Sequence, residues 1–136
     1  DYIKDIRKGQ LLFYEEDGTL RVLRDINSFT SFAAAKNSDF SSNRVVRVLA
    51  SIANDVANIF SKYYLGKQSN NANGRNLLKA EILAYHEELM KLEAIEGFTA
   101  DDITVEKGTE KQDVVVYEAI QPVDAMEKLY MKVEVA

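Results

Sequence analysis

The end of the chain, residues 128–136, alternates strictly between apolar and polar side chains. One side of an extended backbone there would carry Leu129, Met131, Val133 and Val135, and the other Lys128, Tyr130, Lys132 and Glu134. This period of two predicts a β-strand with one buried face. An unpaired strand exposes a row of backbone hydrogen-bonding groups, so we expect this strand to require a partner.

The composition is that of a globular domain. The chain has 136 residues, of which 46% are hydrophobic and 29% charged, and we predict a single domain over residues 1–136. The net charge of −5, without clustered Lys and Arg, argues against nucleic acid as a partner. No apolar run approaches the roughly 18 residues of a membrane span, so we expect no membrane partner. The chain begins with Asp1 rather than Met, and we expect it to be a piece of a longer protein.

Spacing along the chain predicts seven elements. Asp17-Gly18, between residues 10–14 and 19–26, indicates a tight hairpin. Apolar residues at spacings of three and four predict two long helices, the first ending at Gly66 and the second at Gly97. Residues 103–106 and 113–120 form a second predicted hairpin, which the terminal strand follows. The order ββααβββ favours an α+β fold, with two long helices packed on one face of a mostly antiparallel sheet. The predicted helical core is Val45, Leu49, Ile52, Val56, Leu78, Ile82, Leu89 and Leu92.

The sequence offers no candidates for catalysis, cofactor binding or metal binding. His86 is the one histidine, and we expect it at the surface or boundary of the second helix. Cysteine is absent, and so are the glycine-rich phosphate-binding and nucleophile-elbow motifs. The acidic pairs Glu15-Glu16 and Asp101-Asp102 are interpreted as solvated turns, and Tyr63-Tyr64 as packing residues rather than a nucleic-acid platform. We therefore predict a protein that is not an enzyme.

Three segments carry a resemblance to a known family. They are residues 43–55, residues 73–77 and above all Gln121-Pro122-Val123-Asp124-Ala125-Met126-Glu127-Lys128. Together they resemble the C-terminal domain of contractile phage tail sheath proteins, in particular those of Gram-positive phages, defective prophages and phage-tail-like bacteriocins. The likeness covers roughly residues 10 to 136. The upstream sheath domains have no counterpart in these residues.

The resemblance implies a structural, non-enzymatic subunit that polymerises as a helical sheath around the tail tube and contracts. The implied partners are other sheath subunits, the tube protein, the baseplate and the tail terminator. The implied location is the virion tail, with assembly in the host cytoplasm. The family exchanges terminal strands between subunits, which assigns that role to Leu129, Tyr130, Met131, Lys132, Val133, Glu134 and Val135.

Two further assignments accompany the strand. Gln121, Pro122, Val123 and Asp124 are interpreted as a hinge, because Pro122 cannot donate to a strand ladder and should interrupt pairing there. A bulge or turn inside one hairpin explains the same residues. The resemblance implies that this domain lies nearest the tube, and Arg44 and Arg47 share the polar side of the first helix, so we expect them to face an acidic tube surface. Solvated helix charges are the alternative.

Two other functions fit the sequence. One is a binding module unrelated to phages, whose sheet edge captures a peptide by β-augmentation. The other is a small enzyme that uses only Asp, Glu, Lys and Tyr. Filaments or rings formed by the full-length protein would favour the sheath over the binding module.

Overall fold

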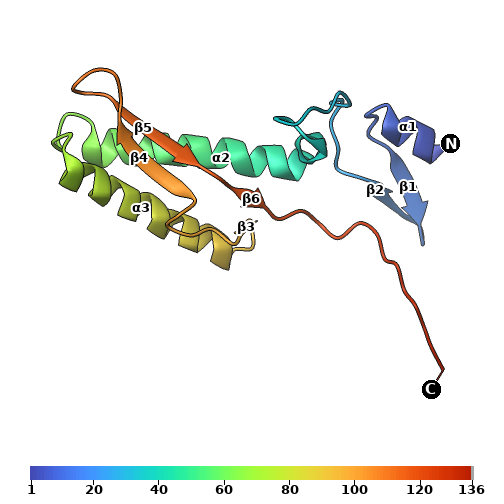
Figure 1. The fold of residues 1–136 in the computed structure, drawn as a ribbon. Helices are drawn as coiled ribbons and strands as arrows, with labels where there is room; N and C mark the ends of the chain where they lie inside the picture. The colour runs from blue at the N-terminus through green and yellow to red at the C-terminus, as the bar shows by residue number, and fades with distance from the viewer. Residues whose placement is uncertain (136) are drawn as a thin grey trace. The chain divides into compact units, whose positions relative to one another are not determined.

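The computed structural model describes residues 1–135, and it has the α+β class that the sequence predicts (Figure 1). Ala136, the last residue of the predicted terminal strand, lies outside the described residues. Two compact units make up the chain, one from residues 1–46 with 124–136 and the other from residues 47–123. That residues 1–136 form a single domain stays a prediction.

The first unit begins with a short helix that the sequence pattern did not predict. Helix α1 (Tyr2–Arg7) is capped by the Asp1 side chain, which accepts from the Ile3 amide. Strands β1 (Phe13–Glu16) and β2 (Thr19–Val22) form the predicted hairpin. Its turn residues Asp17 and Gly18 have φ of 51° and 74°, the left-handed conformations of a tight hairpin turn. The turn chemistry of Asp-Gly therefore identified this hairpin correctly.

The remainder of the first unit leads into the long helix α2 (Asn43–Ile59) through a 3₁₀ turn, η1 (Ser38–Ser41). The Oγ atom of Ser42 accepts from the Val45 amide at 3.4 Å and caps the first turn. Ile26 and Val45 are buried here, with 7% and 3% of their surface exposed.

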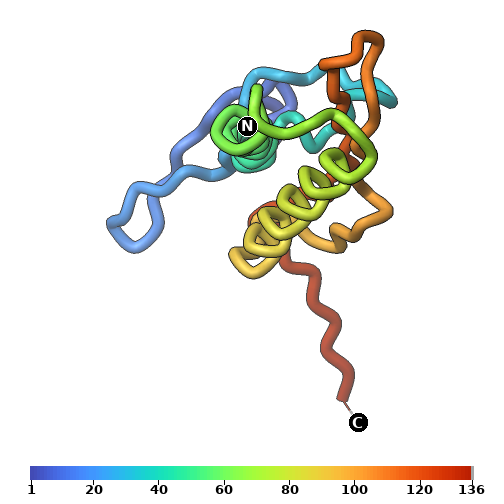
Figure 2. Tube along the Cα trace, turned by 90° about the vertical axis from the view of Figure 1, so that its left-hand side faces the viewer, coloured from blue at the N-terminus to red at the C-terminus, as the bar shows by residue number. Residues whose placement is uncertain are grey.

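The second unit contains most of both long helices and the second hairpin. Helix α2 runs into one π turn, η2 (Phe60–Tyr64), and Gly66 follows at φ +68°, as the sequence predicts. Helix α3 (Ala72–Lys91) starts at the N-cap Asn71, whose side chain accepts from the Gly74 amide at 2.8 Å. The two helices run in opposite directions and are inclined to each other (Figure 1, Figure 2), and β4 of the hairpin packs against α3.

The strands form three separate two-stranded antiparallel sheets rather than one sheet, which corrects that part of the prediction. The pairs are β1 with β2, β4 (Ile103–Lys107) with β5 (Val114–Glu118), and β3 (Ile95–Glu96) with β6 (Gln121–Pro122). The β3–β6 pair contains two residues on each strand.

The core of the second unit joins α2, α3 and the β4–β5 hairpin. Its buried members are Ile52, Leu78, Ile82, Ile95, Phe98 and Ile103, each at most 5% exposed. The predicted core residues Val45, Ile52, Leu78 and Ile82 are buried, and Val56 and Leu89 pack against the cluster. Leu49 is half-buried.

Two predictions about α3 are wrong. Leu92 is 75% exposed rather than buried, because the helix ends at Lys91 and the buried row runs through positions 78, 82 and 86. His86 occupies the third of these positions and is 0% exposed, whereas the sequence suggested the surface or boundary. A row at spacing four leaves the position of Leu92 facing water.

The contrast between Ile82 and Leu92 tests this core. Ile82→Ala removes a side chain with no exposed surface and should lower the free energy of unfolding by about 2–5 kcal/mol. Leu92→Ala, the control, should change it by less than about 0.5 kcal/mol. Urea denaturation of both variants measures the difference, and equal losses would contradict the assigned face of α3.

Candidate intersubunit interface

The terminal segment, residues 124–135, contains no helix or strand in the structure. Both Figure 1 and Figure 2 draw it as a single run of chain. Among the described residues, the predicted strand therefore has no partner of its own subunit. That the strand forms and requires a partner stays a prediction.

Both sides of the terminal segment are exposed, including every apolar side chain of the alternating pattern. The exposed fractions are 85% for Leu129, 76% for Met131, 75% for Val133 and 98% for Val135. Tyr130, on the other side, is 88% exposed. An apolar row of this size in water is typical of an interaction surface.

The predicted hinge residues lie where the segment leaves the second unit. Gln121 and Pro122 form β6, and Pro122 is paired opposite Ile95. The Val123 amide donates to the Ala94 carbonyl at 3.0 Å, so pairing continues past the proline. The expectation that Pro122 interrupts pairing is therefore wrong. Proline fits because its position in a two-residue ladder requires no donor from it.

Near its start, the terminal segment makes one ion pair with another residue of the first unit. Arg24 Nε donates to Glu127 Oε2 at 2.6 Å. Of the residues after Glu127, the described ones make an ion pair only between Lys132 and Glu134, which are both in the segment. Side-chain contacts of the first unit thus hold the segment at its beginning.

Open strand edges are the complementary feature. Each described strand pairs with one neighbour, which leaves its other edge without a strand. The β4–β5 hairpin has the longest ladder, with five residue pairs from Ile103–Glu118 to Lys107–Val114. Its free edges are therefore long enough to receive a strand of similar length.

Hydrogen bonds between tyrosines and carboxylates connect the two helices of the second unit. Tyr64 Oη donates to Glu81 at 2.7 Å, and Tyr85 Oη donates to Asp55 at 2.6 Å. Burial, followed by the Glu81 carboxylate, raises the pKa of Tyr64 to about 12. Burial and the Asp55 carboxylate likewise raise the pKa of Tyr85 above its ordinary value. Both tyrosines are consequently neutral donors at ordinary pH.

His86 forms the other polar contact of this core, and the sequence gave no signal for it beyond its place in the apolar row. Its Nε2 lies 3.2 Å from Glu118 Oε2 in β5, and its ring stacks on Phe98 with centroids 4.1 Å apart. Burial lowers the pKa of His86, but the contacts with Glu118 and the Ile82 carbonyl outweigh burial and raise it above 6.5.

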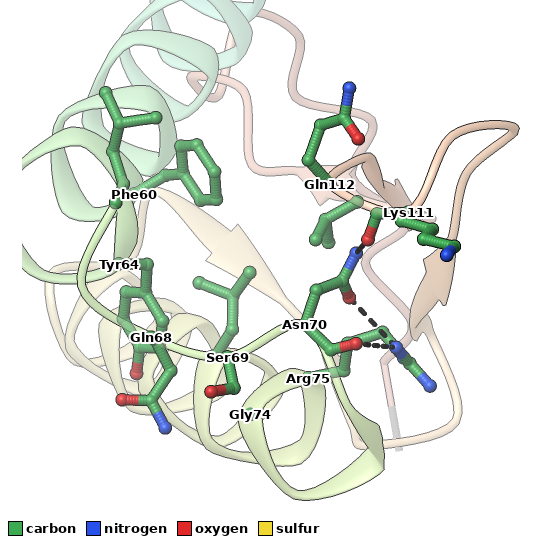
Figure 3. Close-up of a pocket in the computed structure, with 13 residues that line it drawn as sticks. Phe60, Tyr64, Gln68, Ser69, Asn70, Gly74, Arg75, Lys111 and Gln112 are labelled. Atoms are coloured by element: carbon green, nitrogen blue, oxygen red, sulfur yellow. Dashed lines mark hydrogen bonds between the residues drawn. The ribbon is translucent and has the colours of Figure 1, made fainter.

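A cavity of about 540 Å³ lies between the end of α2, the start of α3 and the turn of the β4–β5 hairpin (Figure 3). Asn70 crosses it, with Nδ2 donating to the Lys111 and Asp113 carbonyls at 2.9 and 2.8 Å. Arg75 in turn donates to Asn70 Oδ1 at 2.9 Å. The lining residues include no His, Cys, Asp or Glu.

The remaining predicted site residues lie on α2. Arg44 is half-buried and Arg47 is exposed, and their spacing of three puts both on one side of the helix. The described residues contain no group of three or more potential metal ligands. None of the described helices combines the length and the apolar composition needed to cross a membrane.

The fold and the terminal segment define an α+β module with open strand edges. The family of phage tail sheath C-terminal domains matches residues 35–136. PBSX protein XkdK of Bacillus subtilis is 32% identical over 98% of the chain, and the tail sheath protein of Clostridium phage phiCD119 is 32% identical over 79%. The chain therefore belongs to the phage tail sheath family.

Solved structures agree with this assignment. The crystal structure of the sheath tail protein from Desulfitobacterium hafniense superposes with a TM-score of 0.82, at 42% identity over 97% of the chain. The chain spans 30% of XkdK, 29% of the Clostridium phage protein and 31% of the Desulfitobacterium chain. The resemblance to tail sheath proteins inferred from the sequence is confirmed.

The exposure of the terminal segment predicts its effect on stability. Removing residues 129–136 should change the free energy of unfolding by less than about 0.5 kcal/mol, because the described residues of the segment bury no side chain. Thermal denaturation of the truncated and complete chains measures this. A large loss of stability would mean that the segment belongs to the fold of its own subunit.

Proposed function

We propose that this chain is part of a structural subunit of a contractile tail sheath. The subunit polymerises around the tail tube and contracts to drive the tube into the target cell. Membership of the tail sheath family supports the structural role. The proposed partners are other sheath subunits, the tube protein, the baseplate and the tail terminator. The particle is a phage, a prophage element or a phage-tail-like bacteriocin, and assembly takes place in the host cytoplasm.

The observation behind the proposed mechanism is the exposed terminal segment. Residues 129–135 alternate like a strand, expose their apolar row, and have no strand partner among the described residues of their own chain. Pairing with the sheet of a neighbouring subunit would satisfy the backbone groups and bury the apolar row together. Exchange of this kind is head-to-tail and produces an open polymer when the rotation does not close.

The β4–β5 hairpin is the best-supported acceptor for the exchanged strand. It has the longest ladder and lies inside residues 35–136, which match the sheath C-terminal domain. The β1–β2 hairpin lies outside that range, and β3–β6 has two residue pairs. A neighbour's residues 129–135 would thus extend the hairpin to three strands.

The hinge of the proposal begins later than the sequence suggested. Gln121, Pro122 and Val123 make backbone bonds or ladder contacts with residues 94–96. The boundary between the two compact units falls between Val123 and Asp124. We place the hinge at Asp124 and the residues directly after it, which lets each terminal segment change direction while its root stays paired.

Deleting Tyr130 to Ala136 from the full-length protein should abolish sheath assembly, because the strand that links subunits is lost. The helical core should stay folded, since its packing does not involve these side chains. Negative-stain microscopy with circular dichroism measures both outcomes. Sheaths that still form and contract after this deletion would contradict strand exchange.

A matched pair of variants separates strand pairing from simple loss of chain. Met131→Asp with Val133→Asp places charges on the apolar side and should prevent assembly. Lys132→Ser with Glu134→Ser changes the adjacent residues on the opposite side of the predicted strand and should leave assembly intact. Equal effects of the two pairs would argue against a strand with one buried face.

The tube-facing role of Arg44 and Arg47 is a second part of the proposal. Arg44→Glu with Arg47→Glu should weaken assembly on purified tubes, and added salt should weaken the wild type in the same direction. Lys4→Glu with Lys8→Glu makes the same charge change at exposed positions of the first unit and serves as control. Co-sedimentation with tubes is the readout, and unchanged binding by the α2 variant would refute this contact.

A further inference from the structure

The buried imidazole of His86 connects three elements of the second unit. Helix α3 carries it, and its Nδ1 lies 2.8 Å from the Ile82 carbonyl oxygen. Its ring stacks on Phe98, at an interplanar angle of 16°. Its Nε2 lies 3.2 Å from Glu118 Oε2, and the Glu118 side chain is 12% exposed. The established family assignment gives this cluster no role.

The chemistry of these contacts requires one shared proton. A carbonyl oxygen only accepts, so Nδ1 must carry the hydrogen that Ile82 receives. Nε2 then faces a carboxylate oxygen, and a proton must lie between these two atoms for their contact to be attractive. Without it, a ring lone pair would face the Glu118 carboxylate in a buried place, where unpaired polar atoms are costly.

The cluster lies beside the point where the terminal segment leaves this unit. Phe98 comes two residues after β3, and Glu118 comes three residues before β6. Strands β3 and β6 share two residue pairs, followed by the bond from the Val123 amide to Ala94. His86 therefore contacts one residue close to β3, Phe98, and one residue close to β6, Glu118. The short β3–β6 ladder directly precedes the terminal segment.

We propose that the proton shared by His86 and Glu118 is a pH-sensitive clamp on the root of the terminal segment. With the proton in place, the imidazole holds Phe98 and Glu118 against α3 and keeps the β3–β6 ladder closed. Without it, the ladder opens and the root gains freedom of direction. The role of the clamp in assembly rests on the proposed function, because the segment that it holds is the one proposed to be exchanged between subunits.

Tyr85, Asp55 and Glu118 are the other titratable groups around His86. From α2, Asp55 accepts the bond from Tyr85, which is next to His86 on α3, and β5 contributes Glu118. Burial and these carboxylates raise the pKa of Tyr85 above its ordinary value of 10, so it stays neutral below pH 9.5. Within this cluster, His86 is the group whose raised pKa lies nearest to neutral pH.

The sign of the pH effect follows from the raised pKa of His86. The folded state holds the proton more tightly than the unfolded state, for which the pKa is about 6.5. The clamp's contribution is therefore fully present below pH 6.5 and is lost as pH rises through the folded pKa. The β3–β6 ladder should open on the alkaline side.

Hydrogen exchange at the amides of residues 119–121 and 123 measures the clamp directly, because Pro122 has no amide hydrogen. Protection factors, corrected for the intrinsic base-catalysed rate, should fall as the pH rises from 6 to 9.5, by on the order of tenfold for each unit by which the pKa of His86 is raised. Amides in the middle of α2 serve as the internal reference and should keep their protection. Constant protection at residues 119–121 and 123 over this range would overturn the proposal.

Two amide substitutions separate the clamp from general effects of charge. In Glu118→Gln, the side-chain amide donates to the neutral Nε2, so the contact persists without a titrating proton and protection should no longer depend on pH. Glu96→Gln changes the carboxylate that accepts from Gln121 at 3.0 Å on the same ladder, and should keep the wild-type fall. A wild-type fall in Glu118→Gln would refute the role of the pair.

A second measurement covers the case in which Glu118→Gln fails to fold. The Cε1 proton of His86, followed by NMR in the wild type, should titrate with the same midpoint as the loss of protection. Separate midpoints would overturn the proposal. All these measurements use the unassembled chain, so they do not depend on whether strands are exchanged between subunits. The assembly variants, in turn, test strand exchange whether or not the clamp exists.

Discussion

Backbone groups at the edge of a strand must find a hydrogen-bonding partner or water, and this requirement governs the molecule. Every described sheet here has two strands, so each strand has one edge that no other strand covers. The terminal segment adds a run of unpaired backbone with an exposed apolar row. The sheets have free edges that could accept a strand, and the predicted terminal strand has no sheet edge to pair with. Each could supply the partner that the other lacks. Under the proposed function, neighbouring copies of the same subunit would supply both partners.

The helical core explains how such a subunit stays folded while its ends are unpaired. Ile52, Ile82 and Ile103 are buried inside the second unit and involve nothing from residues 124–135. Two tyrosine-to-carboxylate bonds connect α2 and α3, and the His86–Glu118 contact connects α3 to β5. Exchange of the terminal segment would therefore leave the interior packing unchanged. A sheath that rearranges without unfolding its subunits needs that separation.

Local sequence signals predicted the elements well where backbone chemistry dictates them. Asp17 and Gly18 specified their turn, and apolar spacing located both long helices. The two-residue strand β3 carries no periodic signal, and its pairing with β6 depends on residues 25 positions away, Glu96 and Gln121. The division into three small sheets was missed for the same reason, because ladder partners are set by the tertiary packing.

The candidate site was predicted unevenly. Alternation predicts a strand at residues 129–135, where the structure has none, so the strand and its partner stay predictions. Polarity misled at His86, whose Nδ1 lies 2.8 Å from the Ile82 carbonyl oxygen and whose Nε2 lies 3.2 Å from the carboxylate of Glu118, 32 residues away in sequence. Leu92 misled in the opposite way, because the end of α3 moved it outside the buried row.

The central claim is that residues 129–135 complete the sheet of another subunit, and a cryo-EM map of the assembled sheath tests it most directly. At a resolution that traces the main chain, the account predicts a third strand on the β4–β5 hairpin, contributed by residues 129–135 of a neighbouring copy. A map in which this segment folds back onto its own subunit, or in which the hairpin remains two-stranded in the sheath, would contradict it.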